Sequence, residues 1–131
     1  MRLLVVDDNP GDIELLRFAF ETAEEALELR IAHDGDAALE ELERAANAGD
    51  LPELVLLDLN MPRRDGFGVL SELQERRLYP GLTVAVWTSS TAARDRDRAL
   101  GSGAIAVLAK PSGIDEYAAM IRTLRGLVRP R

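Results

Sequence analysis

Residues 3–8 have the sequence LLVVDD and residues 54–58 have the sequence LVLLD, so that two short apolar segments each end in aspartate. Two further apolar segments, 84–88 (VAVWT) and 104–110 (AIAVLAK), end in threonine and lysine. Segments of this length that are apolar throughout are typical of strands buried on both faces, as in parallel sheets. The four segments therefore predict neighbouring strands of one sheet with polar groups at their ends.

Amphipathic helical patterns separate these strands. Asn9 and Pro10 have the residue types of an N-cap and a first helical position, and Ile13, Leu16, Phe20 and Ala23 follow at helical spacing. We expect strands at 3–6, 27–32, 54–57, 84–87 and 104–108, and helices beginning at Pro10, at Asp34 or Gly35, near Phe67, at 91 and near Ile114. This alternation predicts an α/β fold, a doubly wound five-stranded parallel sheet with helices on both faces.

The composition excludes several classes of protein. The 131 residues suit a single domain spanning 1–131, and 47% apolar residues are enough for a core. A net charge of −7 argues against binding to nucleic acid or to an anionic membrane surface. The chain has no cysteine, and its apolar runs are far shorter than the roughly 20 residues of a membrane span. Because acidic residues follow the N-terminus too early for a signal peptide, we expect a cytoplasmic protein.

The polar ends of the predicted strands should meet, because the carboxyl ends of parallel strands lie at one edge of a sheet. If the first and third strands are neighbours, Asp7, Asp8 and Asp58 form one shallow pocket that Thr88 and Lys110 flank. Carboxylates this close repel one another without a cation, and oxygen ligands alone favour Mg²⁺, with Mn²⁺ as an alternative. An aspartate beside Mg²⁺ can attack phosphorus to form an acyl phosphate, for which the threonine offers a hydrogen bond and the lysine a charge.

Lys110 is the only lysine among 16 basic residues. In a chain that otherwise uses arginine, a lysine at this strand end indicates a need for a compact point charge, although chance is the alternative explanation. His33, the only histidine, is expected at the surface and not as a ligand. The run 94–98 (RDRDR) is expected to be a solvated helix with internal ion pairs, with partner docking as the alternative.

Taken in order, these elements resemble the response-regulator receiver domain of two-component signalling. The matching elements are Asp7-Asp8, Asp58, the stretch 60–66 (NMPRRDG), Thr88 and Lys110-Pro111. The likeness runs from about Arg2 to Val128, and five elements in order are specific where each alone is weak. The stretches 7–10 (DDNP), 57–60 (LDLN) and 63–66 (RRDG) are more particularly similar to stand-alone regulators found beside bacterial phytochrome kinases. The resemblance implies a flavodoxin-like sheet with strand order 2-1-3-4-5.

The resemblance also implies a role for each matching residue. Asp58 would accept a phosphoryl group from the phosphohistidine of a histidine kinase, and Thr88 would then move toward that group. Lys110 would pair with it, across a cis peptide bond to Pro111. The Mg²⁺ ligands would be Asp7 (directly or through water), Asp8, Asp58 and the main-chain carbonyl of Asn60. Such a domain is regulatory and no enzyme, apart from residual autophosphatase activity.

One position departs from the family pattern. The family usually has an aromatic residue three positions before the lysine, where this chain has Val107. In the usual switch that ring turns inward as the hydroxyl moves, which a valine cannot do. Trp87 is no replacement, because alternation along a strand turns its side chain to the sheet face opposite Thr88.

The expected function is a phosphorylation-dependent switch. Since the sequence ends three residues after Val128, we expect output by protein–protein contact, by dimerisation or by phosphorelay. The expected partners are a histidine kinase, with a bacterial phytochrome as one candidate, and a second copy bound through the fourth helix, fifth strand and fifth helix.

Three other functions remain as alternatives. One is a phosphatase that forms an aspartyl phosphate, a family whose nucleophile loop has a pattern like Asp-x-Asp with the second aspartate as general acid. Residues 58–60 of this chain read DLN, and the amide of Asn60 cannot act as that acid. A flavin carrier on the same sheet needs a phosphate loop after the first strand, where this chain has DDNP at 7–10 and only 5% aromatic residues overall. A receiver-like domain that no longer takes phosphate is disfavoured because all five chemical residues are present.

Overall fold

The computed structural model describes residues 1–61, 64–76, 79, 81–90 and 92–128, so Pro62, Arg63 and Thr91 of the sequence predictions lie outside the described residues. The strands are β1 (Arg2–Val6), β2 (Glu28–Ala32), β3 (Leu54–Asp58), β4 (Val84–Thr88) and β5 (Ala106–Ala109). The helices are α1 (Pro10–Thr22), α2 (Gly35–Asn47), α3 (Gly66–Arg76), α4 (Ala93–Gly101) and α5 (Ile114–Leu127).

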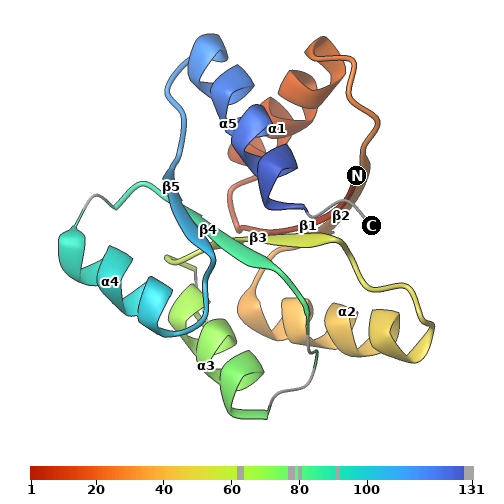
Figure 1. Ribbon diagram of the computed structural model, residues 1–131, viewed down its shortest axis with the longest axis vertical. Coiled ribbons are helices and arrows are strands. Elements are labelled where there is room, and N and C mark those ends of the chain that lie inside the picture. The colour runs from red at the N-terminus through yellow and green to blue at the C-terminus, as the bar shows by residue number, and fades with distance from the viewer. Residues whose placement is uncertain (62–63, 77–78, 80, 91, 129–131) are drawn as a thin grey trace.

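The five strands form one parallel sheet in the order β2-β1-β3-β4-β5. Helices α1 and α5 cover one face of this sheet, and α2, α3 and α4 cover the other (Figure 1). The predicted α/β class, the doubly wound arrangement and the strand order are all confirmed. None of the described helices has the length and apolar character that a bilayer crossing requires.

Each face of the sheet has its own apolar layer, because successive strand residues point to opposite faces. Leu3, Val5 and Trp87 pack against α1 and α5, whereas Leu4 and Val86 pack against the other three helices. These side chains are 0% exposed, and each contributes about 2 kcal/mol through removal of apolar surface from water. The sheet is therefore a rigid support for the residues at its carboxyl edge.

Two helices begin directly at that edge, and both begin as the sequence predicts. The Asn9 side chain accepts hydrogen bonds from the N–H groups of Gly11 (2.9 Å) and Asp12 (3.2 Å), which caps α1. The Asp34 side chain caps α2 by accepting from Ala37 N at 2.8 Å. Because capping satisfies N–H groups that have no partner within a helix, it fixes how the chain turns after β1 and β2.

Several predicted boundaries differ from the observed ones. Helix α1 ends at Thr22, so Ala23 is its exposed C-cap and not part of the buried face. The predicted start of the fifth strand, Ala104 and Ile105, precedes β5, and the Ile105 side chain is 47% exposed. Helix α5 ends one residue before Val128. Element ends depend on tertiary contacts as much as on local pattern, which explains these shifts.

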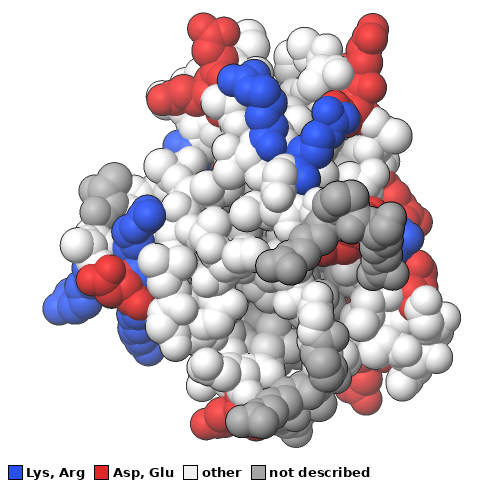
Figure 2. All heavy atoms as spheres, in the orientation of Figure 1, with Lys and Arg blue, Asp and Glu red and all other residues white. Residues whose placement is uncertain are grey.

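The charged run on α4 is solvated, but its predicted internal ion pairs are absent among residues 92–101, all of which the structure describes. Asp95 instead accepts a hydrogen bond from Ser90 Oγ at 2.9 Å, and the Arg98 guanidinium lies 4.0 Å from the centre of the Phe67 ring. Basic and acidic side chains gather over α4 in Figure 2. His33 is exposed just after β2, as predicted.

Candidate phosphoacceptor and metal site

Three carboxylates meet at the carboxyl edge of the sheet. Asp7 follows β1 and Asp58 ends β3, and these two strands are neighbours in the sheet. One oxygen each of Asp7, Asp8 and Asp58 lies within 4.8 Å of the others. Asp7 is 0% and Asp58 4% exposed, whereas Asp8 is open to solvent. The predicted clustering is confirmed, while the roles of these residues stay predictions at this point.

Main-chain N–H groups orient the two buried carboxylates. Asp7 Oδ1 accepts from Asn9 N at 2.9 Å, and Asp58 Oδ1 accepts from Asn60 N at 3.3 Å. Asp7 Oδ2 is buried and accepts no hydrogen bond of good geometry within the described residues. A buried carboxylate oxygen in this condition is costly unless a cation compensates it.

A glycine allows the loop after Asp58 to fold back against it. A Cβ atom on Gly66 would lie 2.4 Å from the Asp58 carbonyl oxygen, so no larger residue fits there without movement of the backbone. The Gly66 N–H donates to the carbonyl of Leu59 at 3.1 Å. The glycine that the sequence resemblance includes is thus required by this close approach of two backbone segments.

Lys110 supplies positive charge to the cluster. Its Nζ lies 2.8 Å from Asp7 Oδ2 and 3.6 Å from Asp58 Oδ2. Its backbone N–H donates to the Thr88 carbonyl at 2.9 Å, which places the residue directly after β5. The lysine side chain is 12% exposed. The only lysine of the sequence therefore lies where the strand-end argument places it.

Sequence reasoning missed two neighbours of this lysine. Lys110 Nζ donates a hydrogen bond to Asp12 Oδ2 at 2.8 Å, and it lies 5.0 Å from the centre of the Trp87 ring. Asp12 lies in the first turn of α1, the helix that begins directly after Asp7 and Asp8, and this closeness in sequence could have indicated that it lies near the strand end. Its simpler interpretation, an acidic residue favoured in the first turn of a helix, concealed its second role.

Thr88 is positioned but not engaged with the carboxylates. Asp58 pairs with Trp87 across β3 and β4, so Thr88 lies one residue beyond the strand partner of Asp58. Its hydroxyl is buried with the residue at 2% exposure and accepts a hydrogen bond from Ser90 N at 3.0 Å. Trp87 packs against α1 and α5, on the face opposite Thr88, as predicted. Val107 packs on the other face, partly buried.

The predicted cis bond is wrong. The peptide bond between Lys110 and Pro111 is trans, and no described peptide bond is cis. A trans bond is the lower-energy isomer before proline by about 0.5–1 kcal/mol, and Lys110 reaches the carboxylates from this backbone.

The cluster shifts the acidity of its members. Burial, followed by the negative charge of Asp7, raises the pKa of Asp58 from 3.8 to about 6, although Lys110 and the Asn60 N–H oppose this rise. Burial would lower the pKa of Lys110, but its contacts with Asp12 and Asp7 and the charge on Asp58 raise that pKa overall. Near pH 7.5 the lysine is charged and Asp58 is mostly ionised.

These groups fit a hard divalent cation. Three carboxylates offer only oxygen ligands, and one oxygen each of Asp7, Asp8 and Asp58 lies within 4.8 Å of the others. Mg²⁺ and Mn²⁺ prefer such ligands. Asp7, Asp8 and Asp58 could therefore provide carboxylate ligands to Mg²⁺ or Mn²⁺.

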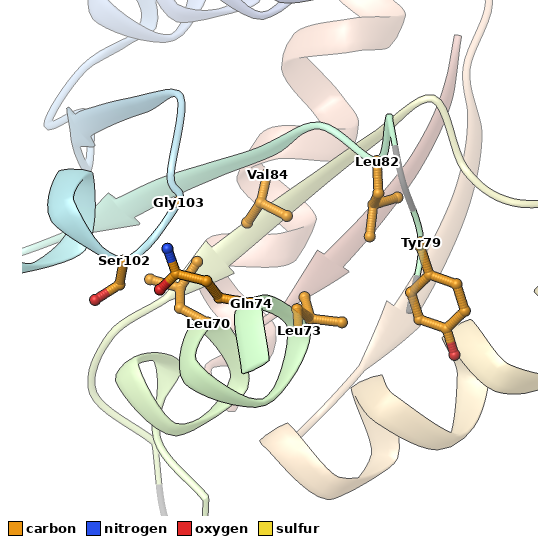
Figure 3. A pocket seen from close by; sticks show the side chains of 8 residues that line it. All are labelled: Leu70, Leu73, Gln74, Tyr79, Leu82, Val84, Ser102 and Gly103. Atoms are coloured by element: carbon orange, nitrogen blue, oxygen red, sulfur yellow. The ribbon is translucent and has the colours of Figure 1, made fainter. Parts of the chain in front are cut away.

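The opposite edge of the sheet has a different character. A cavity of about 630 Å³ opens there between α3, the start of β4 and the turn after α4. Figure 3 shows Leu70, Leu73, Leu82 and Val84 around it, with no carboxylate among the labelled side chains. This cavity lies far from the carboxylates along the strands, because β4 begins at Val84 and ends at Thr88.

The comparisons with known proteins agree with this geometry. A family model described as the response regulator receiver domain matches residues 3–122. Response regulator MprA of Mycobacterium avium (strain 104) is 35% identical over 130 residues, which cover 99% of this chain and 53% of MprA. The chain therefore belongs to the response regulator receiver domain family. It spans about half of the length of this relative.

Solved structures give the same result. Response regulator RPA3017, in red light signaling of R. palustris, is 35% identical with a TM-score of 0.84, covering 94% of this chain and 90% of that one. The bacteriophytochrome response regulator AtBRR is 32% identical with a TM-score of 0.77, covering 99% and 94%. The Mn²⁺-bound form of response regulator Rcp1 is 28% identical with a TM-score of 0.77, covering 95% and 91%. The chain is thus similar to phytochrome-associated regulators, within a family of regulatory domains that interact with histidine kinases and bind Mg²⁺ or Mn²⁺ at an acidic pocket.

Proposed function

We propose that this chain is a phosphorylation-dependent switch whose phosphoacceptor is Asp58. The observation that carries the proposal is the position of this carboxylate: 4% exposed, with an oxygen within 4.8 Å of oxygens of Asp7 and Asp8, and 3.6 Å from the ammonium of Lys110. A buried carboxylate among other carboxylates is unfavourable for stability alone. A chemical role for Asp58 accounts for a carboxylate at this unfavourable position.

The transfer reaction follows from the acidity of the acceptor. With a pKa of about 6, Asp58 is mostly ionised near neutral pH and can attack phosphorus. A carboxylate oxygen forms the new O–P bond as the P–N bond of the donor phosphohistidine breaks. The leaving imidazole nitrogen keeps the electron pair of that bond and recovers neutrality by taking a proton. The product is an aspartyl phosphate, a mixed anhydride that hydrolysis returns to carboxylate, which gives a residual autophosphatase activity.

The residues around Asp58 divide the remaining tasks. Mg²⁺, or Mn²⁺ in its place, would be held by Asp7, Asp8, Asp58 and the main-chain carbonyl of Asn60, and when bound would offset the negative charge of the phosphoryl oxygens. Asp7 is positioned for this by its bond from Asn9 N.

Thr88 and Lys110 would contact the phosphoryl group after transfer. The Thr88 hydroxyl accepts one hydrogen bond and donates none within the described residues, so its proton is free for a phosphoryl oxygen. Lys110 already lies beside the acceptor and supplies a positive charge. Movement of the threonine toward the phosphoryl group would bias the α4–β5–α5 face between two states.

The phosphoryl donor would be a histidine kinase, with a bacterial phytochrome as the candidate. Its support is the likeness to RPA3017 and AtBRR, whose names connect them to red light and bacteriophytochrome. We extend the proposal to a single receiver domain at 1–131 that acts in the cytoplasm. Output would leave by protein contact, by phosphorelay or by a second copy bound through α4, β5 and α5, where Leu100 (39%) and Ile105 (47%) are exposed apolar side chains.

The test is chemical labelling. The purified chain is incubated with a ³²P-labelled small phosphodonor and Mg²⁺, and we expect one label per chain that survives acid and is released by hydroxylamine. Asp58→Asn should abolish the label and EDTA should prevent it, while Asp97→Asn on exposed α4 should label like the natural chain. A label that persists in Asp58→Asn would refute the assignment.

A further inference from the structure

Asp12 makes a contact that the proposed phosphorylation chemistry does not use. Its Oδ2 accepts a hydrogen bond from Lys110 Nζ at 2.8 Å, across 98 positions of sequence. The distance from the same ammonium to Asp58 Oδ2 is 3.6 Å. Asp7 Oδ2 also lies 2.8 Å from this ammonium, so the lysine contacts Asp12 of α1 and Asp7 more closely than it contacts the acceptor itself.

We propose that Asp12 is a positioning residue that holds Lys110 away from Asp58 and competes with the phosphoryl group for the lysine. This inference rests on the proposed function of Asp58. The ammonium has three N–H donors, and the well-formed bond in this state goes to Asp12. A phosphoryl group on Asp58 would need at least one of those donors and a share of the charge.

The tether is firmly attached at both ends. The backbone N–H of Asp12 donates to the Asn9 side chain at 3.2 Å, which anchors the residue in the first turn of α1. The Lys110 backbone is bonded to Thr88, and its ammonium lies over the Trp87 ring. The two side chains are only 25% and 12% exposed, so water competes weakly for their contact.

An acidic residue in the first turn of a helix also stabilises that helix through the macrodipole, without any second role. The two interpretations differ in their consequences. If Asp12 only stabilises α1, its neutralisation should shift the affinities for Mg²⁺ and for an anion in the same direction, or leave both unchanged. If it holds the lysine, neutralisation releases Lys110 from its present position beside Asp12 and Asp7 toward Asp58, where the ammonium opposes a metal ion and favours an anion.

Opposite shifts are therefore the expected result of Asp12→Asn. The dissociation constant for Mg²⁺ alone should rise about fivefold, and that for the phosphoryl mimic trifluoroberyllate at saturating Mg²⁺ should fall about fivefold, a change the size of one net hydrogen bond. Trp87, the only tryptophan, is the reporter, because Lys110 Nζ lies 5.0 Å from its ring and any displacement changes its emission. Both titrations follow Trp87 fluorescence.

Two single variants and one double variant separate the tether from a general effect of charge. Glu14→Gln removes the same charge from an exposed position of α1 and should change neither constant by more than about twofold. Asp12→Glu should restore much of the natural behaviour. In the Lys110→Gln background, Asp12→Asn should have no further effect on trifluoroberyllate, because the residue acts through the lysine.

The outcomes are distinct. Equal or parallel shifts of both constants in Asp12→Asn, or an undiminished effect in the Lys110→Gln background, would overturn the tether while leaving Asp58 as the acceptor. Absence of Mg²⁺-dependent trifluoroberyllate binding by the natural chain would overturn the proposed function, and the tether with it.

Discussion

The two edges of this sheet are built from opposite chemistry. At the carboxyl edge, Asp7 and Asp58 are buried beside each other and paired with Lys110. At the amino edge, Leu54 and Val84 are buried among apolar side chains on opposite faces of the sheet, and Val84 lines the cavity there. Burial stabilises the amino edge, whereas at the carboxyl edge it holds like charges together at a cost.

This difference shows which edge is maintained for chemistry. Strands β3 and β4 are each apolar at the amino end and polar at the carboxyl end. The polar residues therefore do not result from a lack of apolar residues for the core. Stability at the amino edge should be insensitive to pH and to metal ions, while stability at the carboxyl edge should depend on both. Variants at each edge can break or sharpen this comparison.

The largest effect is expected for Lys110→Met. Without the ammonium, three acidic side chains lose their shared cation, and the free energy of unfolding in metal-free buffer at pH 7.5 should fall by about 4 kcal/mol. Added Mg²⁺ should restore part of this loss. Urea denaturation with and without EDTA measures it, and Arg122→Met on exposed α5 should stay within about 0.5 kcal/mol of the natural chain. A loss of unfolding free energy no larger than that of Arg122→Met would contradict the role of Lys110 as the shared cation of the carboxylates.

Leu54→Ala tests the amino edge. Leu54 is 0% exposed, and its truncation should lower the free energy of unfolding by about 3 kcal/mol. No titrating group is involved, so the loss should be the same at pH 5 and pH 8 and with or without Mg²⁺. A loss that varied with either condition would break the proposed contrast between the edges.

Asp58→Asn should stabilise the metal-free chain. Because the pKa of Asp58 is raised from 3.8 to about 6 on folding, the folded state binds its proton more tightly than the unfolded state does. In the natural chain, the contribution of this group to the free energy of unfolding therefore falls by about 3 kcal/mol in total as the pH rises from 4 through 6. After allowance for burying the amide, we expect a gain of about 2 kcal/mol at pH 8 that largely vanishes near pH 4. Denaturation in EDTA at both pH values decides it, and destabilisation at pH 8 would show that the carboxylate is not under strain.

Asn9→Ala should have the smallest effect. Loss of the α1 cap should cost about 1 kcal/mol, because two N–H groups lose their acceptor. The backbone N–H of residue 9 still donates to Asp7, so Mg²⁺ affinity by Trp87 fluorescence should change less than twofold. Asn47→Ala at the exposed end of α2 is the control, and a large loss of Mg²⁺ affinity in Asn9→Ala would show that the cap and the site are coupled.

Local patterns were enough to predict most of the fold. Apolar segments such as 54–57 indicate buried strands, and Asn9 and Asp34 predict helix starts, because both features depend on near neighbours in sequence. The predictions that failed concern terminations and surface pairings: Ala23 lies past the end of α1, while Arg98 contacts the Phe67 ring and Arg96 the Val107 carbonyl, and within the described residues neither pairs with an aspartate of α4. Such contacts depend on which elements pack nearby.

The candidate site divides in the same way. Strand-end chemistry indicated Asp7, Asp58, Thr88 and Lys110, since parallel strands bring their carboxyl ends to one edge whatever the loops do. Strand-end chemistry could not predict the isomer of the peptide bond before Pro111, because the trans and cis forms differ little in energy and the surrounding structure selects one.

By itself, the sequence determined which elements form and which charges reach the carboxyl edge of the sheet, because periodicity and strand polarity are properties of the chain. Only the tertiary structure decided that an acid of α1, Asp12, contacts the lysine beside Asp7. Helix α1 and the segment after β5 are brought together by the packing of α1 with α5 on one face of the sheet, and this sets Lys110 closer to Asp12 than to Asp58. A hydrogen bond across 98 residues depends on that relative placement, which no local pattern encodes.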